Sequence, residues 1–169
     1  MARGDDLFVE FVRTSSPRLL HAAYLLTGNR HQAEDAAQTA LARTYAVWPK
    51  IRNGDAYAYT RRVLANHVID KWRRPIREHA TDWVPEVPVR GDVADEVTQQ
   101  QWLRAALGQL TARERTIVVL RHFFDLPEAE VAAELKVSVG TVKSTNSRAL
   151  AKLRISIEPG ATLISGEGP

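Results

Sequence analysis

Apolar residues recur at helical spacing along most of the chain, and no segment shows the alternation expected of a half-buried strand. The first pattern, over 7–26, predicts one helix, or a pair of helices if Pro17 breaks it. An Ala-rich segment, 32–48, predicts a second helix, and residues 55–73 predict a third. Short polar turns separate these segments, so we expect a helical amino-terminal unit over residues 5–74.

The chain changes character after this unit. Residues 75–98 contain prolines and several acids and lose the helical periodicity, which predicts an acidic linker. A helical pattern resumes over 99–155, where four short helices would form a second unit. The remaining segment, 156–169, is expected to be a loose tail. The predicted fold class is therefore all-α, with two small helical domains joined by a flexible linker.

The second unit has the spacing of a helix-turn-helix. Thr111 and Glu114 fit a capping box at the start of one helix. Pro127 suits the first turn of the next helix, and Ser138 can cap a further helix after a short turn. Lys136 occupies the turn position most often filled by Gly, so we expect it in a left-handed backbone conformation.

The helix after Ser138 is expected to have two different faces. One face is polar and basic, with no Asp or Glu up to Arg154. Exposed faces usually mix both signs of charge, so this face indicates a negatively charged partner, either nucleic acid or an acidic protein. The predicted buried stripe consists of Val139, Val142, Ala149, Leu150 and Leu153, broken by Asn146. The outward residues suited to a DNA major groove are Thr141, Lys143, Ser144, Ser147, Arg148 and Lys152.

The predicted helix over 55–73 carries a second polar face. Winding at about 100° per residue gathers Tyr59, Arg62, Asn66 and Arg73 opposite an apolar side. Aromatic, amide and guanidinium groups side by side can stack on unpaired bases and hydrogen-bond to them. The alternative is an ordinary exposed face in which Tyr59 is half-buried.

Two acids lie near the start of the predicted helix over 32–48. Glu34 and Asp35 would oppose the helix dipole in the first turn, so capping is the simplest interpretation. His31 and Glu34 are also spaced to ligate a metal, but no further pair of His or carboxylate residues completes such a site. We therefore predict no metal and no cofactor.

Composition narrows the classes of function. The chain has 169 residues, a net charge of +3 and no cysteine, which removes disulfides and thiolate nucleophiles and suits a reducing compartment. No signal-peptide pattern and no apolar run of membrane-spanning length occurs, so we expect a cytoplasmic protein without a membrane partner. Its histidines are scattered and no Gly-rich phosphate loop is present, so an enzyme is not expected.

Several motifs in a fixed order resemble bacterial RNA polymerase sigma factors of the extracytoplasmic-function group. They read AEDAAQTAL, then AYAYTRRVLANHVIDKWRR, then LTARERTIVVLRHFFDLPEAEVAAELKVSVGTVKS followed by RALAKLR. The resemblance covers about residues 5–74 and 99–155. The wording of QTAL and GTVKSTNSRALAKLR is most similar to the actinobacterial SigE-type subfamily.

The resemblance implies a division of labour between the two units. The first would bind core RNA polymerase at the clamp of the largest subunit and hold the melted −10 element, while the second would contact the flap of the second subunit and read the −35 element. Whether an anti-sigma protein also binds stays open. The implied polymerase-binding residues are Asp35, Gln38, Leu41 and Ala42. The implied −10 residues are Ile51, Arg52, Asn53, Tyr59, Arg62 and Asn66.

A stand-alone transcriptional regulator is the alternative of another class. It would bind duplex DNA as a dimer through residues 127–154, which accounts for the helix-turn-helix. It gives no role to the loop over 49–55 or to the polar face that contains Tyr59. Co-purification with core polymerase separates the two hypotheses.

Overall fold

The computed structural model describes residues 2–51, 55–73 and 94–156, and within those ranges the regular structure is helical, as predicted. The chain divides into two compact units, Met1–Asp82 and Trp83–Pro169. Apart from Ser156, the last residue of α7, the predicted tail over 156–169 lies outside the described residues, as does most of the predicted linker.

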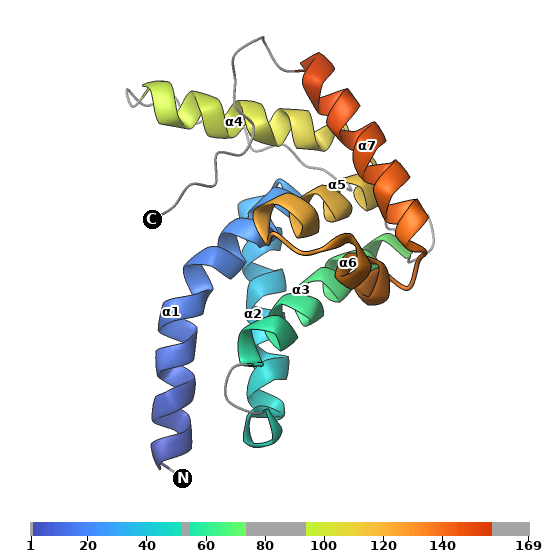
Figure 1. The fold of residues 1–169 in the computed structure, drawn as a ribbon. Coiled ribbons are helices and arrows are strands. Elements are labelled where there is room, and N and C mark those ends of the chain that lie inside the picture. Colours follow the sequence, from blue (N-terminus) through green and yellow to red (C-terminus); the bar gives the residue numbers. More distant parts are fainter. Residues whose placement is uncertain (1, 52–54, 74–93, 157–169) are drawn as a thin grey trace. The chain divides into compact units, whose positions relative to one another are not determined.

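The first unit contains three α-helices, α1 (Ala2–Thr27), α2 (Arg30–Ala46) and α3 (Ala56–Arg73), with a short 3-10 turn at Trp48–Lys50 (Figure 1). The break considered at Pro17 does not occur, because α1 continues through this residue as one helix. Its missing N–H removes only one intrahelical hydrogen bond, and Ser15 and Leu19, on either side of it, are buried. Gly28 has a φ of 68° and ends α1 as expected.

The core of the first unit lies where α1 and α3 pack on α2. Leu19, Leu26 and Leu64 are almost completely buried. The buried side of α2 is built from alanines, which let the neighbouring helices approach closely; these are Ala33, Ala36, Ala37 and Ala40. At the end of this side Thr44 and Thr60 are fully buried, and their hydroxyl oxygens lie 2.8 Å apart.

The start of α2 corrects the capping interpretation of the two acids. Asn29 is the N-cap residue, and its side chain accepts a hydrogen bond from the Gln32 backbone N–H at 3.0 Å. Because the helix begins at Arg30, Glu34 and Asp35 lie beyond its first turn. Glu34 instead pairs with Arg30 at 3.2 Å, one turn earlier on the same helix.

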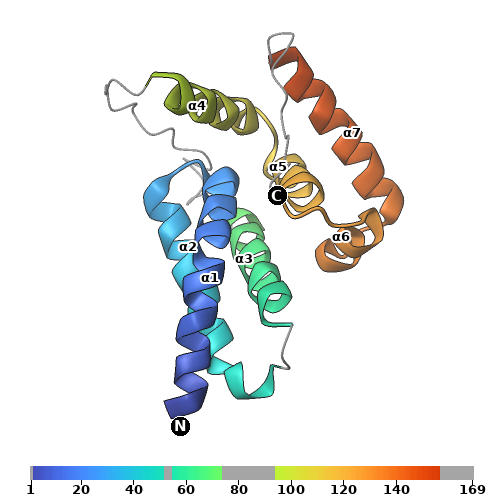
Figure 2. The ribbon, with the colours of Figure 1, turned by 60° about the vertical axis from the view of Figure 1, so that its left-hand side comes forward.

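The second unit contains the helices α4 (Ala94–Gly108), α5 (Ala112–Val118), α6 (Glu128–Leu135) and α7 (Val139–Ser156). A π-helical segment, η3 (Val119–Phe123), extends α5. Helix α4 starts at Ala94, before the position at which the sequence pattern placed the start of the second unit. Figures 1 and 2 both show that α7 follows α6 after a short turn.

The core of the second unit contains polar groups as well as apolar side chains. The predicted capping box is present, since Thr111 Oγ1 accepts from the Glu114 N–H at 3.2 Å and the Thr111 N–H donates to Glu114 Oε2 at 3.1 Å. Arg115, 2% exposed, donates to carbonyl oxygens at the end of α4. The largest buried apolar side chains are Ile117, Leu120, Val131, Val142 and Leu153.

Candidate nucleic-acid and polymerase interfaces

The turn between α6 and α7 has the predicted geometry. Lys136 has φ 56° and ψ 46°, in the left-handed region, and the Val137 N–H bonds to the Ala132 carbonyl oxygen at 3.0 Å. Ser138 Oγ then accepts from the Thr141 N–H at 3.0 Å, which caps α7. Leu135 is buried just before the turn. The second unit therefore contains a helix-turn-helix.

The buried stripe of α7 differs in part from the predicted one. Val142, Ala149 and Leu153 are buried as expected. Val139 is 46% exposed because it occupies the first turn of the helix, and Leu150 is only half-buried. Thr145 is buried, and no apolar signal in the sequence marked it as a core residue.

The outward face of α7 is polar and basic. Lys143, Ser144, Ser147 and Arg148 are exposed, and Thr141 is half-buried beside the cap. Ser144 Oγ donates to the Thr141 carbonyl oxygen at 3.2 Å. Arg148 donates to Thr145 Oγ1 at 3.3 Å. These side chains share one surface without an acid from their own helix, which is the arrangement that a polyanion requires.

Lys152 and Asn146, in contrast, contact other parts of the second unit. Lys152 Nζ lies 2.8 and 2.9 Å from the two carboxylate oxygens of Glu114. Asn146 Oδ1 lies 3.1 Å from His122 Nε2 on η3. The sequence pattern placed Lys152 among the outward residues, and nothing in helical spacing alone indicates its partner on α5.

Burial and hydrogen bonding act in opposite directions on the Glu114 carboxyl. Desolvation raises its pKa, but the hydrogen bonds from Lys152 Nζ and the Thr111 N–H and the positive charges of Lys152 and Arg148 outweigh burial. The pKa of Glu114 therefore lies below its ordinary value of 4.5. The residue is charged at neutral pH although only 7% of its surface is exposed.

The polar face of α3 is exposed in the part that the structure describes. Arg62 and Asn66 are exposed and Tyr59 is half-buried. Thr60 and Arg61, adjacent in sequence, are buried, which the periodicity did not indicate. Two other predicted −10 residues, Arg52 and Asn53, lie outside the described residues, as does the side chain of Arg73.

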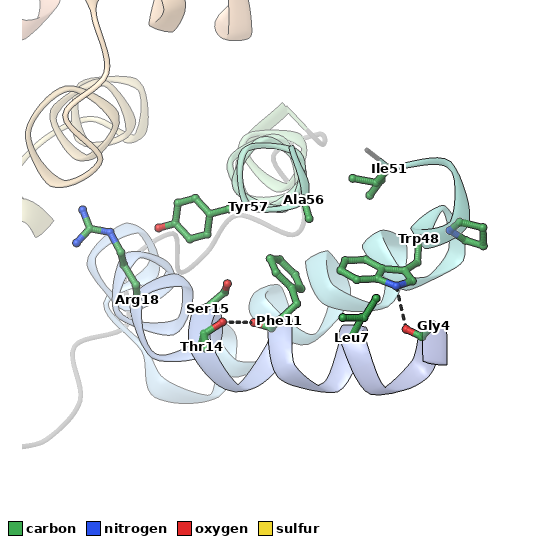
Figure 3. A pocket seen from close by; sticks show the side chains of 11 residues that line it. Gly4, Leu7, Phe11, Thr14, Ser15, Arg18, Trp48, Ile51, Ala56 and Tyr57 are labelled. Atoms are coloured by element: carbon green, nitrogen blue, oxygen red, sulfur yellow. Dashed lines mark hydrogen bonds between the residues drawn. The ribbon is translucent and has the colours of Figure 1, made fainter. Parts of the chain in front are cut away.

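A cavity of about 620 Å³ lies between α1, the 3-10 turn and the start of α3, all in the first unit. Figure 3 shows Leu7 and Trp48 toward one end and Arg18 and Tyr57 toward the other. Trp48 Nε1 donates to the Gly4 carbonyl oxygen at 3.0 Å, which holds the start of α1 against the turn. The full lining is Gly4, Leu7, Phe11, Thr14, Ser15, Arg18, Trp48, Pro49, Ile51, Ala56 and Tyr57. Ile51 is thus the predicted −10 residue that borders this cavity.

The residues implied to bind polymerase share one side of α2. Asp35, Gln38 and Ala42 are exposed at a spacing of three and four residues, and Leu41 is half-buried beside them. Asp35 Oδ2 lies 3.4 Å from Lys71 Nζ and 4.0 Å from His67 Nε2, both on α3. The structure brings these four residues together, and the sequence alone did not indicate the contacts to α3.

His67 lies under this surface. Its Nε2 atom is buried and has no hydrogen-bond partner among the described residues. Burial, together with the charges of Lys71 and Arg43, lowers the pKa of His67, and the nearby carboxylates of Asp35 and Asp70 offset this only in part.

Metal ligation and membrane insertion find no support in the described ranges. No group of three or more His, Cys, Asp or Glu residues within 2–51, 55–73 and 94–156 is arranged to hold a metal ion. His31, considered with Glu34 as a ligand pair, has an exposed side chain. Among the helices described, none is both long and apolar enough to cross a bilayer.

Comparison with known proteins agrees with this geometry in both units. Residues 11–77 match the family model described as Sigma-70 region 2, and residues 100–153 match that of Sigma-70, region 4. The RNA polymerase sigma-E factor of Streptomyces coelicolor is 42% identical over 149 residues, which cover 87% of this chain and 84% of that protein. The ECF RNA polymerase sigma factor SigW of Bacillus subtilis is 28% identical, with 90% of each chain covered.

Solved structures show the same fold. The sigma factor RpoE of Bartonella quintana, in complex with the anti-sigma factor NepR, superposes with a TM-score of 0.72 at 23% identity, covering 91% of this chain and 98% of that one. CnrH, in complex with the cytosolic domain of CnrY, gives a TM-score of 0.62 at 20% identity.

A helix-turn-helix unit of region 4 and a three-helix unit of region 2 define the class: the chain belongs to the sigma-70 family of RNA polymerase sigma factors. Within that family it is an extracytoplasmic-function sigma factor of the SigE type. Its partners are core RNA polymerase and promoter DNA. The dimeric stand-alone regulator is not favoured, because the match to region 2 accounts for the first unit.

Proposed function

We propose that the two exposed polar faces divide promoter recognition between them. Helix α7 reads the −35 element as duplex in the major groove, through Lys143, Ser144, Ser147 and Arg148, with Thr141 at the edge of the surface. The observation that carries this proposal is the acid-free, exposed face of a helix held by a capped helix-turn-helix. Hydroxyl and guanidinium groups can reach base edges and phosphates there.

The face of α3 takes the −10 element as single strand. Arg62 and Asn66 are exposed and Tyr59 is half-buried beside them, so a cation, an amide and an aromatic ring lie along one helix. These groups stack on and hydrogen-bond to bases that have left the duplex. Unstacking a base costs a few kcal/mol. Because this surface binds bases only after they unstack, the binding offsets that cost and favours melting of the duplex. Ile51, Arg52 and Asn53 in the preceding loop complete this proposed surface.

Helix α2 supplies the proposed contact with the clamp of the polymerase. Asp35, Gln38 and Ala42 form an exposed strip beside the half-buried Leu41. The second unit would meet the flap of the second subunit.

Once polymerase holds both units, binding of one promoter element raises the effective concentration of the other, so two weak contacts give a specific complex. No covalent step is assigned to this chain, and we propose that it acts in the cytoplasm with the polymerase.

Regulation by an anti-sigma protein is a further part of the proposal. RpoE and CnrH, whose folds resemble this one, were solved in complex with the anti-sigma factor NepR and the cytosolic domain of CnrY. A protein of that kind would act by occupying surfaces that polymerase needs. Co-purification of the chain from its host, in the presence and absence of added core polymerase, would detect a competing partner.

Transcript start sites test the role itself. Overproduction of the chain should create new start sites that share two upstream motifs, and the chain should bind fragments carrying them only when core polymerase is present. Tight binding of the duplex by the chain alone, as a dimer, would instead support the stand-alone regulator.

Two variants then test the assignment of the faces. Arg148→Ala should weaken holoenzyme binding to an isolated −35 duplex by roughly 5- to 150-fold, corresponding to about 1–3 kcal/mol. Asn66→Ala should leave that probe unaffected and should reduce binding to a −10 single strand and to promoters with a pre-melted bubble. Equal losses for both variants on the −35 duplex would contradict the assignment.

A further inference from the structure

The Glu114 carboxylate joins the start of α5 to the last turns of α7. Both of its oxygens accept from Lys152 Nζ, at 2.8 and 2.9 Å, and Oε2 also accepts from the Thr111 N–H at 3.1 Å. The side chain of Glu114 is 9% exposed, whereas that of Lys152 is 47% exposed. The carboxylate is therefore inside the unit, and the lysine reaches in to it from the helix proposed to bind DNA.

This geometry opposes a role for Lys152 in contacting DNA. To reach a phosphate, Nζ would have to leave a carboxylate that is largely shielded from water. Separating one partner from a buried ion pair leaves an uncompensated buried charge, which is strongly unfavourable. Exposed ion pairs, in contrast, exchange partners at little cost. Lys152 thus differs from Lys143 and Arg148, because its ammonium group is hydrogen-bonded to both oxygens of a largely buried carboxylate.

A second contact holds α7 closer to its middle. Asn146 Oδ1 lies 3.1 Å from His122 Nε2, which belongs to η3. Residues 146 and 152 are about 9 Å apart along a helix axis, at a rise of about 1.5 Å per residue. The two contacts therefore bracket Ser147 and Arg148, two of the residues proposed to meet the −35 element.

We propose that Glu114 and Lys152 form a tether that sets the position of the recognition helix, and that Lys152 is a positioning residue with no contact to promoter DNA. This inference rests on the proposed role of α7. The tether fixes how far the outward residues project beyond the unit, because α5 is held independently of Glu114 by the hydrogen bonds from buried Arg115 to the carbonyl oxygens of Leu107 and Leu110. Its loss lowers discrimination between promoters more than general affinity for DNA.

The chain offers variants that separate the two roles. Glu114→Gln removes the charge but keeps an oxygen for the Thr111 N–H, since Gln also completes a capping box. Lys152→Met removes the ammonium group and keeps the length of the side chain. Lys152→Arg keeps a charge that can still reach the carboxylate. Arg154→Met is the matched control, because it removes one exposed cation two residues later on the same helix.

The measurement is the affinity of the holoenzyme, over a series of KCl concentrations, for a promoter fragment from the start-site mapping and for the same fragment with its upstream motif scrambled. We expect Glu114→Gln and Lys152→Met each to lower the ratio of the two affinities by roughly fivefold, and the double variant to lower it no further. Lys152→Arg should restore most of the ratio, and Arg154→Met should leave it unchanged. The dependence of log K on log[KCl] should be the same for Lys152→Met as for the natural chain.

A phosphate contact gives the opposite result. If Lys152 binds the DNA backbone, Lys152→Met lowers the affinity for both fragments equally and reduces the salt slope by about 0.9, while Glu114→Gln has no effect. That outcome would overturn the inference.

Failure of the proposed function is distinguishable, because the natural holoenzyme would then not discriminate between the fragments. In that case melting of the free chain still tests the tether: additive shifts for the two single variants would contradict it, and a double variant no less stable than the worse single variant would support it.

Discussion

Within the ranges that the structure describes, two non-glycine residues adopt left-handed backbone conformations, one on each side of α6. Lys136 ends α6 with φ 56°, and Asp125 has φ 55° in the segment before α6. A side chain with a Cβ atom is disfavoured there, although Asp tolerates the conformation better than Lys because its short polar side chain can bond locally. Strain of this kind is therefore larger at Lys136.

We expect Lys136→Gly to stabilise the second unit by about 1 kcal/mol, since glycine adopts this φ without steric cost. Chemical denaturation measures the change. Asp125→Gly is the matched control and should give a smaller gain. Lys136→Ala should give none, because alanine keeps the Cβ atom, and a comparable gain from alanine would show that the lysine side chain, not the backbone, was unfavourable.

His67 gives the first unit a defined dependence on pH. Its pKa is lowered by burial and by neighbouring cations, so the unfolded chain takes up the proton more readily than the folded one. The free energy of unfolding should be at its full value above the ordinary pKa of 6.5 and should fall as the pH decreases from there toward the lower folded pKa. His21, whose pKa burial and Arg18 also lower, acts in the same direction.

His67→Gln should therefore reduce the loss of stability on acidification below about pH 6.5, without removing the part due to His21. Denaturation midpoints over pH 5–8, at about half-unit steps, measure the slope. The control is His31→Gln, at an exposed position, which should leave the slope in place. An unchanged slope in His67→Gln would show that His67 titrates alike in the folded and unfolded chain.

At the scale of elements, α2 and α3 are joined by a polar contact inside an apolar interface. Thr44 and Thr60 are fully buried, with Oγ1 atoms 2.8 Å apart. Each hydroxyl also lies within hydrogen-bond distance of the carbonyl oxygen four residues earlier in its own helix, on Ala40 and Ala56 respectively. Each hydroxyl has one proton, so when one threonine donates to its own helix the other can donate across the interface, and this bond fixes how the two helices face each other.

Replacing either threonine by valine should destabilise the first unit by about 1 kcal/mol, because the partner hydroxyl loses a bond in a buried place. Replacing both should cost less than the sum, since two methyl groups of the same shape can pack together. A double-mutant cycle from urea denaturation gives the coupling. Strict additivity would mean that the hydroxyls contribute only through their own helices.

Helix ends could be predicted from the sequence where a side chain bonds locally. The Thr111–Glu114 capping box and the Ser138 cap were both identified, because each depends on residues three apart. Asn29, which precedes an Ala-rich helix, is the same kind of signal. It was not identified as the N-cap because Glu34 and Asp35 were interpreted as the residues that stabilise this end of the helix.

Burial of polar residues could not be predicted in the same way. Thr145, Arg115 and Glu114 are buried because distant parts of the chain cover them or bond to them, and periodicity contains no information on such partners. Lys152 is exposed, as assigned, but its contact with Glu114 on α5 could not be predicted, for the same reason. Residues whose surroundings are set by one helix were assigned correctly, as the exposure of Lys143 and Ser147 illustrates.

At the scale of the whole molecule, the division into two compact units indicates that each has its own stability. Asn29 caps a helix of the first unit and Ser138 caps one of the second, with similar bond lengths of 3.0 Å. The two caps are therefore comparable perturbations placed in different units.

Asn29→Ala and Ser138→Ala should each cost about 1 kcal/mol, and each loss should stay within its own unit. Hydrogen exchange followed by mass spectrometry should show faster exchange over α2 and its neighbours in the first variant and over α6 and α7 in the second. Faster exchange throughout the chain in either variant would mean that the two units unfold together.

The contact between His122 and Asn146 depends on the number of residues in the π-helical segment η3. A π turn contains one residue more than an α turn, so deleting one residue from Val119–Phe123 would allow a regular α-helical ladder to form. The same deletion would rotate the side chains after it by about 100° and carry the imidazole away from Asn146. Relatives that lack this residue should therefore also have a different side chain at the position of Asn146, so that a gap in one helix and a substitution in another are inherited together.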